Sequence, residues 1–219
     1  MPRVTGLEYA AMNGRKTMIV PVLAVLAIAG AALFAIRSID QATVPLRQAT
    51  VLPEPMSLPE FRLVDQDGNA FARDSLLGHS SLLFFGFTHC PDICPATLQQ
   101  LAAARRELES LRGSAGALPD IILISVDPER DTSEILKAYT GHFGEGVSGL
   151  SGDAAELQKL ASALGIYYAK DESGGPDYTV SHSTAVLLIN GEAKFQALFK
   201  APLDVESLVS DLNLLVDAG

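Results

Sequence analysis

The sequence predicts an α/β domain with a central mixed sheet flanked by helices. Two runs, Ser81–Phe87 and Ile121–Val126, are apolar at successive positions, as in strands that are buried on both faces and pair in parallel. Between them, residues 96–111 place Leu and Ala three or four apart, which indicates a helix with one apolar face. The stretch 185–199 holds two apolar runs around a tight turn, which predicts an antiparallel hairpin. Because parallel and antiparallel pairs occur in one chain, the expected sheet is mixed.

The remaining elements follow from turn and capping residues. Asp65–Asn69 separates two short apolar runs and predicts an N-terminal hairpin, because it contains a glycine suited to a turn. Asp131 and Asp153 each precede a helical pattern with Glu three residues later, which is typical of a helix N-terminus. The expected ranges are helices at 133–143, 153–164 and 203–216 (the last capped by Asp204), a strand at 166–168, a loop at 171–177 and a turn at Asn190–Gly191.

The predicted order is an N-terminal hairpin, then β-α-β-α, an inserted helix and β-β-α. This is the arrangement of a thioredoxin-like fold. That fold keeps its redox or metal chemistry at the first junction between a strand and a helix, which in this chain holds a cysteine pair.

Composition limits the class of protein. The chain has 219 residues and a formal net charge of -10, enough for one ordinary domain with an appendage. Residues 1–57 carry five Lys or Arg and three Asp or Glu, whereas the rest carries 11 basic and 23 acidic residues. A domain this acidic lacks the basic footprint that nucleic-acid binding requires, so no nucleic-acid partner is expected.

An apolar run near the N-terminus predicts a membrane anchor. Met18–Ile36 is 19 residues without a charge, and as a helix it would span about 28 Å, close to the hydrocarbon core of a bilayer. Arg15 and Lys16 precede the run, which favours a cytoplasmic N-terminus over residues 1–17. The alternative is a cleaved signal peptide, but the run is longer than the usual apolar region of about 7–15 residues.

Residues 37–57 predict a tether, because Pro45, Pro53 and Pro55 favour an extended and poorly packed chain. The folded domain is therefore expected over residues 58–219.

Both cysteines of the chain lie in one motif, Thr88-His89-Cys90-Pro91-Asp92-Ile93-Cys94-Pro95. Free N–H groups at a helix start favour a thiolate, so we expect the pKa of these thiols to be lowered. If the first helical turn includes the Cys-x-x-x-Cys spacing, the two sulfurs lie one turn apart on one side. That separation suits a shared soft metal ion, and it also permits a disulfide.

A histidine is expected opposite the two thiols. Thioredoxins carry a proline before the strand that faces their cysteines, but here the stretch Tyr178–Thr184 has no proline and contains His182. Two thiolates and one imidazole are a soft donor set with low coordination number, which suits Cu(I) and tolerates Cu(II). The predicted metal ligands are Cys90, Cys94 and His182.

The chain resembles the Sco/SenC family of membrane-anchored copper chaperones over about residues 58–216. The matching motifs are the Thr88–Pro95 stretch, Ser125–Thr132 with the sequence Ser-Val-Asp-Pro-Glu-Arg-Asp-Thr, and the segment holding His182. The resemblance implies one copper per chain bound at Cys90, Cys94 and His182, and a metallochaperone rather than an enzyme.

The resemblance also implies partners and a location. The family helps to assemble the dinuclear copper centre of respiratory cytochrome c oxidases, by copper delivery, thiol reduction or both. The expected partners are the oxidase subunit carrying that centre and another periplasmic copper carrier as donor. The expected location is the bacterial inner membrane, with a single pass and the soluble domain in the periplasm.

One departure from the family pattern concerns the residue before the histidine, which is often acidic and here is Ser181. It bears on how the imidazole is oriented and not on the ligand itself.

Other functions compete with copper delivery. The Cys90–Cys94 pair could form a structural disulfide, although a bridge closing so short a loop stabilises little. It could instead form a redox disulfide in a thiol–disulfide oxidoreductase that reduces the oxidase cysteines, or act in a peroxidase. A structural zinc site would want four protein ligands, and three are evident. His182 is what copper binding needs and disulfide exchange does not.

Other polar residues have simpler expected roles. His89 adjoins Cys90 and could be a fourth ligand or a neighbour that lowers its pKa, but an exposed turn residue is the favoured interpretation. His79 and His142 are expected to be ordinary surface or loop residues. Asp127 and Arg130 are expected to pair and shape the loop near the site.

Overall fold

The centre of the sheet is formed by the two apolar runs that the sequence marks as buried strands. In the computed structural model, which describes residues 45–113, 116–171, 173, 175 and 178–216, they form β4 (Ser81–Gly86) and β5 (Asp120–Ser125). The strands pair in parallel from Ser81–Asp120 to Gly86–Ser125, and all six residues of β4 are buried. The predicted central parallel pair is confirmed.

The main sheet has eight strands in the order β1-β10-β9-β4-β5-β6-β2-β3. It is mixed, as predicted, because β9 pairs antiparallel to β4 on one side and β5 pairs parallel to β4 on the other. The predicted hairpins are β2–β3 and β9–β10, both antiparallel. The other six strands are β1 (Thr50–Ser57), β2 (Arg62–Asp65), β3 (Ala70–Ala72), β6 (Val147–Ser151), β9 (Val186–Ile189) and β10 (Lys194–Phe199).

Strand β6 was not predicted from the sequence. Its residues are Val-Ser-Gly-Leu-Ser, which lack the apolar run of a buried strand, yet it pairs in parallel with β5. Gly149 explains part of its composition. A Cβ at this position would lie 3.1 Å from the Leu136 Cβ, so the absence of a side chain lets a helix pack closely on the strand.

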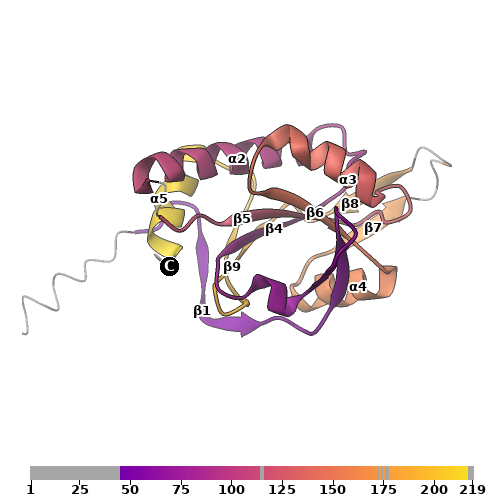
Figure 1. The fold of residues 1–219 in the computed structure, drawn as a ribbon, viewed down its shortest axis with the longest axis horizontal. Helices are drawn as coiled ribbons and strands as arrows, with labels where there is room; N and C mark the ends of the chain where they lie inside the picture. The colour runs from indigo at the N-terminus through magenta and orange to yellow at the C-terminus, as the bar shows by residue number, and fades with distance from the viewer. Residues whose placement is uncertain (1–44, 114–115, 172, 174, 176–177, 217–219) are drawn as a thin grey trace, which may run out of the picture. The chain divides into compact units, whose positions relative to one another are not determined.

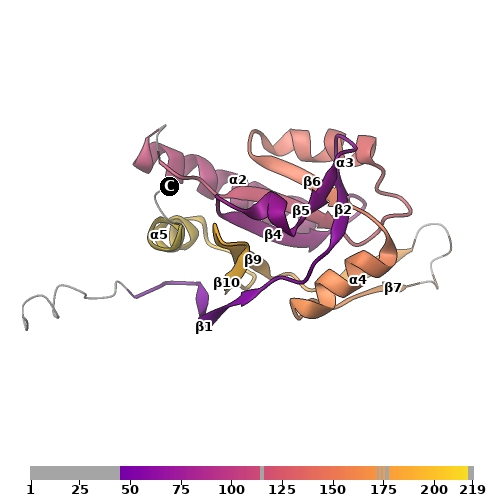
Figure 2. The ribbon, with the colours of Figure 1, turned by 60° about the horizontal axis from the view of Figure 1, so that its bottom comes forward.

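Helices cover the two faces of the sheet. In both views α2 and α3 lie along one side and α4 along the other (Figures 1 and 2). The closing helix α5 packs against α2. The α-helices are α2 (Ile93–Arg112), α3 (Ser133–Thr140), α4 (Ala154–Ala163) and α5 (Val205–Leu215), and two short 3-10 turns lie at η1 (Arg73–Leu76) and η2 (Gly141–Phe143).

Two of the predicted helix caps are confirmed and one is wrong. The side chains of Asp153 and Asp204 accept hydrogen bonds from the first-turn N–H groups of α4 and α5. Helix α3 is capped by Thr132, whose hydroxyl accepts from the Ile135 N–H, and not by Asp131. The Asp131 carboxylate is buried and directed elsewhere, as described below.

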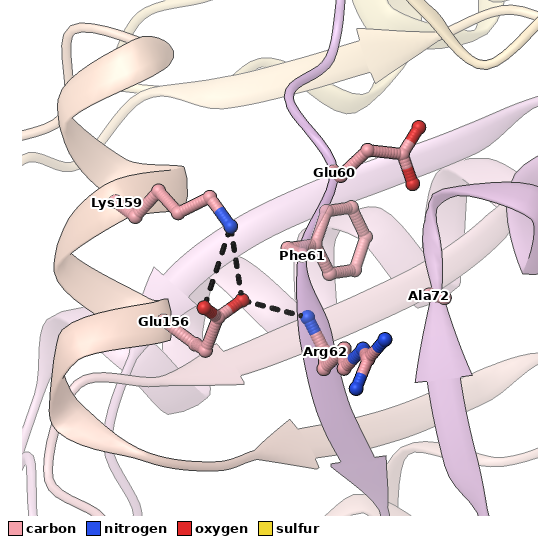
Figure 3. A pocket seen from close by; sticks show the side chains of 6 residues that line it. All are labelled: Glu60, Phe61, Arg62, Ala72, Glu156 and Lys159. Carbon is pink, nitrogen blue, oxygen red and sulfur yellow. Dashed lines mark hydrogen bonds and ion pairs between the residues drawn. The ribbon is translucent and has the colours of Figure 1, made fainter.

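Glu156 fastens α4 to β2 instead of completing a capping box. Its carboxylate accepts from the Arg62 N–H at 2.9 Å and pairs with Lys159 at 3.3 Å (Figure 3). These residues line an open pocket of about 470 Å³ with Glu60, Phe61 and Ala72. Neither cysteine and no histidine lies in its lining, so this pocket is separate from the predicted chemistry.

A second, two-stranded sheet carries His182. It consists of β7 (Tyr168–Asp171) and β8 (Thr179–His182), which pair antiparallel with Tyr168 opposite His182. In both views this hairpin lies at the end of the domain away from β1 (Figures 1 and 2). The strand predicted at 166–168 thus begins two residues later, and β8 was not predicted. The loop predicted at 171–177 falls largely outside the described residues.

The folded domain begins earlier than predicted. Residues 50–57 were expected to belong to a poorly packed tether, but they form β1, which pairs with β10. The prolines misled the prediction because β1 is an edge strand, where a missing N–H can face away from the ladder. The register of the pair shifts between Val51 and Met56, the stretch that contains both prolines. The boundary at residue 58 is therefore wrong.

Within the described residues, no helix is both long and apolar enough to cross a membrane. The predicted anchor at 18–36 lies outside those residues.

A buried carboxylate holds the segment that leads into β1. Asp211 of α5 accepts hydrogen bonds from three successive backbone N–H groups, those of residues 47, 48 and 49, at 2.7–2.8 Å. Its side chain is inaccessible to solvent. Because a buried charge needs compensating donors, the segment and the carboxylate depend on each other.

We predict that Asp211→Ala lowers the free energy of unfolding by about 2–4 kcal/mol, because it removes three charge-assisted hydrogen bonds. Denaturant unfolding followed by circular dichroism would measure the loss. Glu206→Ala is the control, since its ion pair with Arg47 is exposed and should contribute little. Equal stability of the two variants would contradict the role of Asp211 in holding residues 47–49.

Candidate metal centre

The turn after β4 brings both cysteines to the start of α2. The Cys90 N–H donates to the Phe87 carbonyl at 3.3 Å, which turns the chain back at the end of the strand. Helix α2 then begins at Ile93, and the capping residue Asp92 makes no side-chain hydrogen bond to it. Instead the Cys90 Sγ accepts from the Cys94 N–H at 3.4 Å. One sulfur therefore serves as an N-terminal acceptor of the helix that carries the other.

His182 faces the two thiols from the end of β8. Its Nε2 lies 3.4 Å from the Cys94 Sγ, and its Nδ1 lies 2.9 Å from the Ser183 carbonyl oxygen. A carbonyl only accepts, so Nδ1 carries the proton and Nε2 presents its lone pair to the sulfur. The rings of Phe84 and Phe87 meet the imidazole edge-on, each at 5.9 Å between centroids. The ring is thus held by one hydrogen bond and two aromatic contacts.

The structure brings together the three predicted ligand residues. The two sulfurs and an imidazole nitrogen all lie within 4.8 Å of one another. An ion with three ligands and bonds of about 2.0–2.3 Å holds its donors roughly 3.5–4 Å apart. The donors therefore need only small shifts to enclose one ion. Two thiols and an imidazole form the soft set that favours Cu(I).

Burial sets the protonation of the metal-free site. Burial raises the pKa of the Cys94 thiol well above its ordinary value, and the neighbouring Cys90 adds to the effect. The prediction that the helix start lowers the thiol pKa is therefore wrong for Cys94. Burial lowers the pKa of His182, against a smaller opposing effect of the Ser183 carbonyl. The thiol thus keeps its proton beside a neutral imidazole, and binding of a metal as thiolate would release that proton.

A second buried carboxylate fixes the chain just before Cys90. Asp131 accepts from the Thr88 N–H at 3.0 Å, from the Thr88 hydroxyl at 2.6 Å and from the Ser125 hydroxyl at 2.6 Å. Sequence reasoning missed this role because Asp131 also fits the pattern of a helix cap. The sequence does carry a signal for this role, because the polar residues of the Ser125–Thr132 motif come directly after a buried strand.

His89 lies outside the group of three donor atoms. It is exposed, and its Nδ1 lies 3.1 Å from the Thr88 hydroxyl and 3.7 Å from an Asp131 oxygen. His89, Asp127 and Asp131 also lie close enough to hold an ion. However, the carboxylate oxygens of this second group already accept hydrogen bonds from protein donors, so no ligand is inferred there.

The sequence also predicts roles for several other polar residues near the site and on the surface. Asp127 and Arg130 pair as expected. Ser181 is exposed, and the backbone carbonyl of Ser183 orients the imidazole instead. His79 pairs with Asp120 at 3.3 Å, and His142 contacts the Tyr139 carbonyl, so both have the ordinary roles that were expected.

We predict that Gly86→Ala disturbs the site through packing alone. The added Cβ would lie 2.9 Å from the Cys94 Sγ and 3.1 Å from side-chain carbons of Leu123 and Phe84. Copper affinity should fall about tenfold or more, as for other losses of ligand positioning, and can be measured by competition with a chelator. Gly141→Ala is the control, because its Cβ would meet no atom within 4 Å. Unchanged affinity in Gly86→Ala would show that the sulfur tolerates displacement.

Several known proteins are similar to this chain in sequence and in fold. The SCO1/SenC family matches residues 52–217. The chain is 36% identical to Arabidopsis thaliana ScoI with copper bound (TM-score 0.67, covering 72% of this chain and 96% of that one). It is 34% identical to Bradyrhizobium japonicum ScoI with copper bound (TM-score 0.63, covering 72% and 98%).

A full-length relative is much longer than the chain. Over 148 residues the chain is 38% identical to "Protein SCO1 homolog 1, mitochondrial" of Arabidopsis thaliana, covering 68% of this chain but 43% of that protein. The match nevertheless extends through the cysteine turn, the Ser125–Thr132 motif and the His182 hairpin in the family comparison. The chain belongs to the SCO1/SenC family and has its thioredoxin-like α/β fold.

Proposed function

We propose that this protein is a copper chaperone that binds one copper ion through Cys90, Cys94 and His182. The observation that carries the proposal is the lone pair of His182 Nε2, which faces the Cys94 sulfur at 3.4 Å. Copper-bound structures of two relatives support the choice of metal. The soft donor set favours Cu(I), with Cu(II) tolerated.

Copper is the cargo of the proposed function rather than a resident cofactor. Cys94 is inaccessible to solvent, whereas Cys90 and His182 are partly exposed. A partner's ligands would therefore replace Cys90 and His182 first, while Cys94 keeps the ion out of free solution. The proposed recipient is the subunit of a respiratory cytochrome c oxidase that carries its copper centre. The proposed donor is another periplasmic copper carrier.

We predict that His182→Ala lowers copper affinity by more than the roughly 10–100-fold typical of residues that only orient a ligand, because it removes one of three donors. Thiol–disulfide exchange should stay near the wild-type rate, since the nucleophile is a thiolate. His89→Ala is the control and should be mild in both assays, because that imidazole lies outside the donor group. Chelator competition and a thiol-exchange assay measure the two properties.

A second candidate function is thiol–disulfide exchange with the copper-ligand cysteines of the oxidase subunit. It is favoured by the contact of the Cys94 N–H with the Cys90 Sγ and by the separation of the sulfurs, within 4.8 Å. A Cys90–Cys94 disulfide would remove both thiolates, so the oxidised protein should not hold copper. Wild-type copper affinity together with full oxidase assembly in His182→Ala would favour this function over copper delivery.

We also propose that residues 18–36 anchor the protein in the bacterial inner membrane, with residues 1–17 in the cytoplasm and the copper-binding domain in the periplasm. The uncharged length of the run and the basic residues before it support this topology.

An alkaline phosphatase fusion after Gln48 tests this topology, because the enzyme is active only where its disulfides form. We expect an active, membrane-bound fusion. A β-galactosidase fusion at the same residue is the control and should be inactive. An inactive phosphatase would reverse the proposed orientation, and an active but soluble product would show that the run is a cleaved signal peptide.

A further inference from the structure

His182 belongs to a hairpin that is not a strand of the main sheet. Strands β7 and β8 form their own two-stranded sheet, so the eight-stranded ladder does not fix the position of β8. After His182 the chain enters β9, which starts four residues later and is fixed by its pairing with β4. The other side of His182 needs a separate attachment if the imidazole is to stay within reach of the sulfurs.

That attachment is Tyr178, four residues before His182. Its side chain is buried, and its hydroxyl donates to an Asp127 carboxylate oxygen at 2.5 Å. The Arg130 guanidinium lies over its ring at 3.6 Å, and the Lys170 ammonium lies 4.0 Å from the ring centroid. Lys170 also pairs with Glu129 at 2.7 Å. The hairpin is therefore tied to the segment that follows β5 by a hydrogen bond, an ion pair and cation–π contacts.

The partners of Tyr178 are themselves held in place. Asp127 is buried, and its carboxylate pairs with the Arg130 Nε. Its backbone N–H donates a hydrogen bond to the Ser125 hydroxyl oxygen at 3.1 Å. The Arg130 guanidinium also lies 5.9 Å from the ring centroid of Phe87, one of the two rings that meet His182 edge-on. Arg130 thus lies against both Tyr178 and Phe87.

We propose that Tyr178, Asp127 and Arg130 form a latch that positions the His182 imidazole against the two thiols. Tyr178 is a positioning residue, because it acts through His182 and touches neither sulfur. The latch starts from the same short segment whose Asp131 holds Thr88 before Cys90. The segment that follows β5 therefore positions both parts of the site, the cysteine turn and the histidine hairpin. The effect on copper rests on the proposed function, whereas the position of the imidazole does not.

The first test uses the metal-free protein. Tyr178→Phe removes the hydroxyl and leaves the ring between its cations. We expect the His182 ring signals in the NMR spectrum to broaden or shift, because the hairpin loses its hydrogen bond to Asp127. Thr140→Val is the matched control. It also removes one buried hydroxyl, whose oxygen lies within hydrogen-bond distance of Gln66 Oε1 and of the Leu136 carbonyl oxygen, and it should leave the His182 signals unchanged. Unchanged His182 signals in Tyr178→Phe would overturn the latch.

The second test measures Cu(I) affinity by chelator competition. Tyr178→Phe should lower affinity about tenfold, as expected when a partner that orients a metal ligand is lost. Arg130→Lys keeps the charge but not the planar face, and it should lower affinity in the same direction. Thr140→Val should not.

A double-mutant comparison separates positioning from a general loss of structure. In a His182→Ala background, Tyr178→Phe should have no further effect on copper affinity, because the group through which it acts is gone. An equal loss in both backgrounds would overturn the proposal. If neither the wild-type protein nor the His182→Ala variant binds copper, the proposed copper function fails. The latch stands if the His182 signals of the otherwise wild-type, metal-free protein still respond to Tyr178→Phe.

Discussion

The site depends on the directions of three adjacent strands. β4 and β5 are parallel, so their carboxyl ends meet at one edge of the sheet, and the cysteine turn and the segment after β5 leave that edge side by side. β9 runs antiparallel to β4, so its beginning lies at the same edge. The histidine that precedes β9 is thus delivered to the cysteines by strand direction alone. Side chains then adjust the last few ångströms.

Two buried carboxylates make that adjustment, and both follow β5. Asp131 fixes the chain before Cys90, and Asp127 fixes the chain before His182. Unpaired buried charges are costly, but here each carboxylate accepts from hydroxyl, N–H or guanidinium donors. The polar network therefore lies beside the metal donors and not among them. Desolvation raises the pKa of the Cys94 thiol and lowers that of the His182 imidazole, so both groups favour their neutral forms in the metal-free protein.

Much of this fold could be predicted from the sequence because its core strands are continuous apolar runs. The two strands around α2 and the caps Asp153 and Asp204 follow from local pattern alone. Strand β6 was missed because its Ser and Gly residues reflect close packing under α3, a tertiary demand that periodicity does not show. β1 was missed because edge pairing tolerates its prolines. Asp131 was misassigned because a local cap and a long-range clamp have the same sequence pattern.

The three donor residues could be proposed from the sequence, but their chemistry could not. The position at a helix start suggested an activated thiolate, whereas burial of Cys94 in the structure raises the pKa of its thiol. A thiol that keeps its proton is a poor nucleophile yet remains a metal ligand, because bond formation with the ion can drive out the proton. The two cysteines also differ in exposure, because Cys90 is partly exposed and Cys94 is buried. Attack on a partner's disulfide would therefore begin at Cys90, with Cys94 left to resolve it. Under the proposed copper function, the same asymmetry would let copper leave from the Cys90 side while Cys94 holds it last, so one arrangement of burial is compatible with both proposed chemistries.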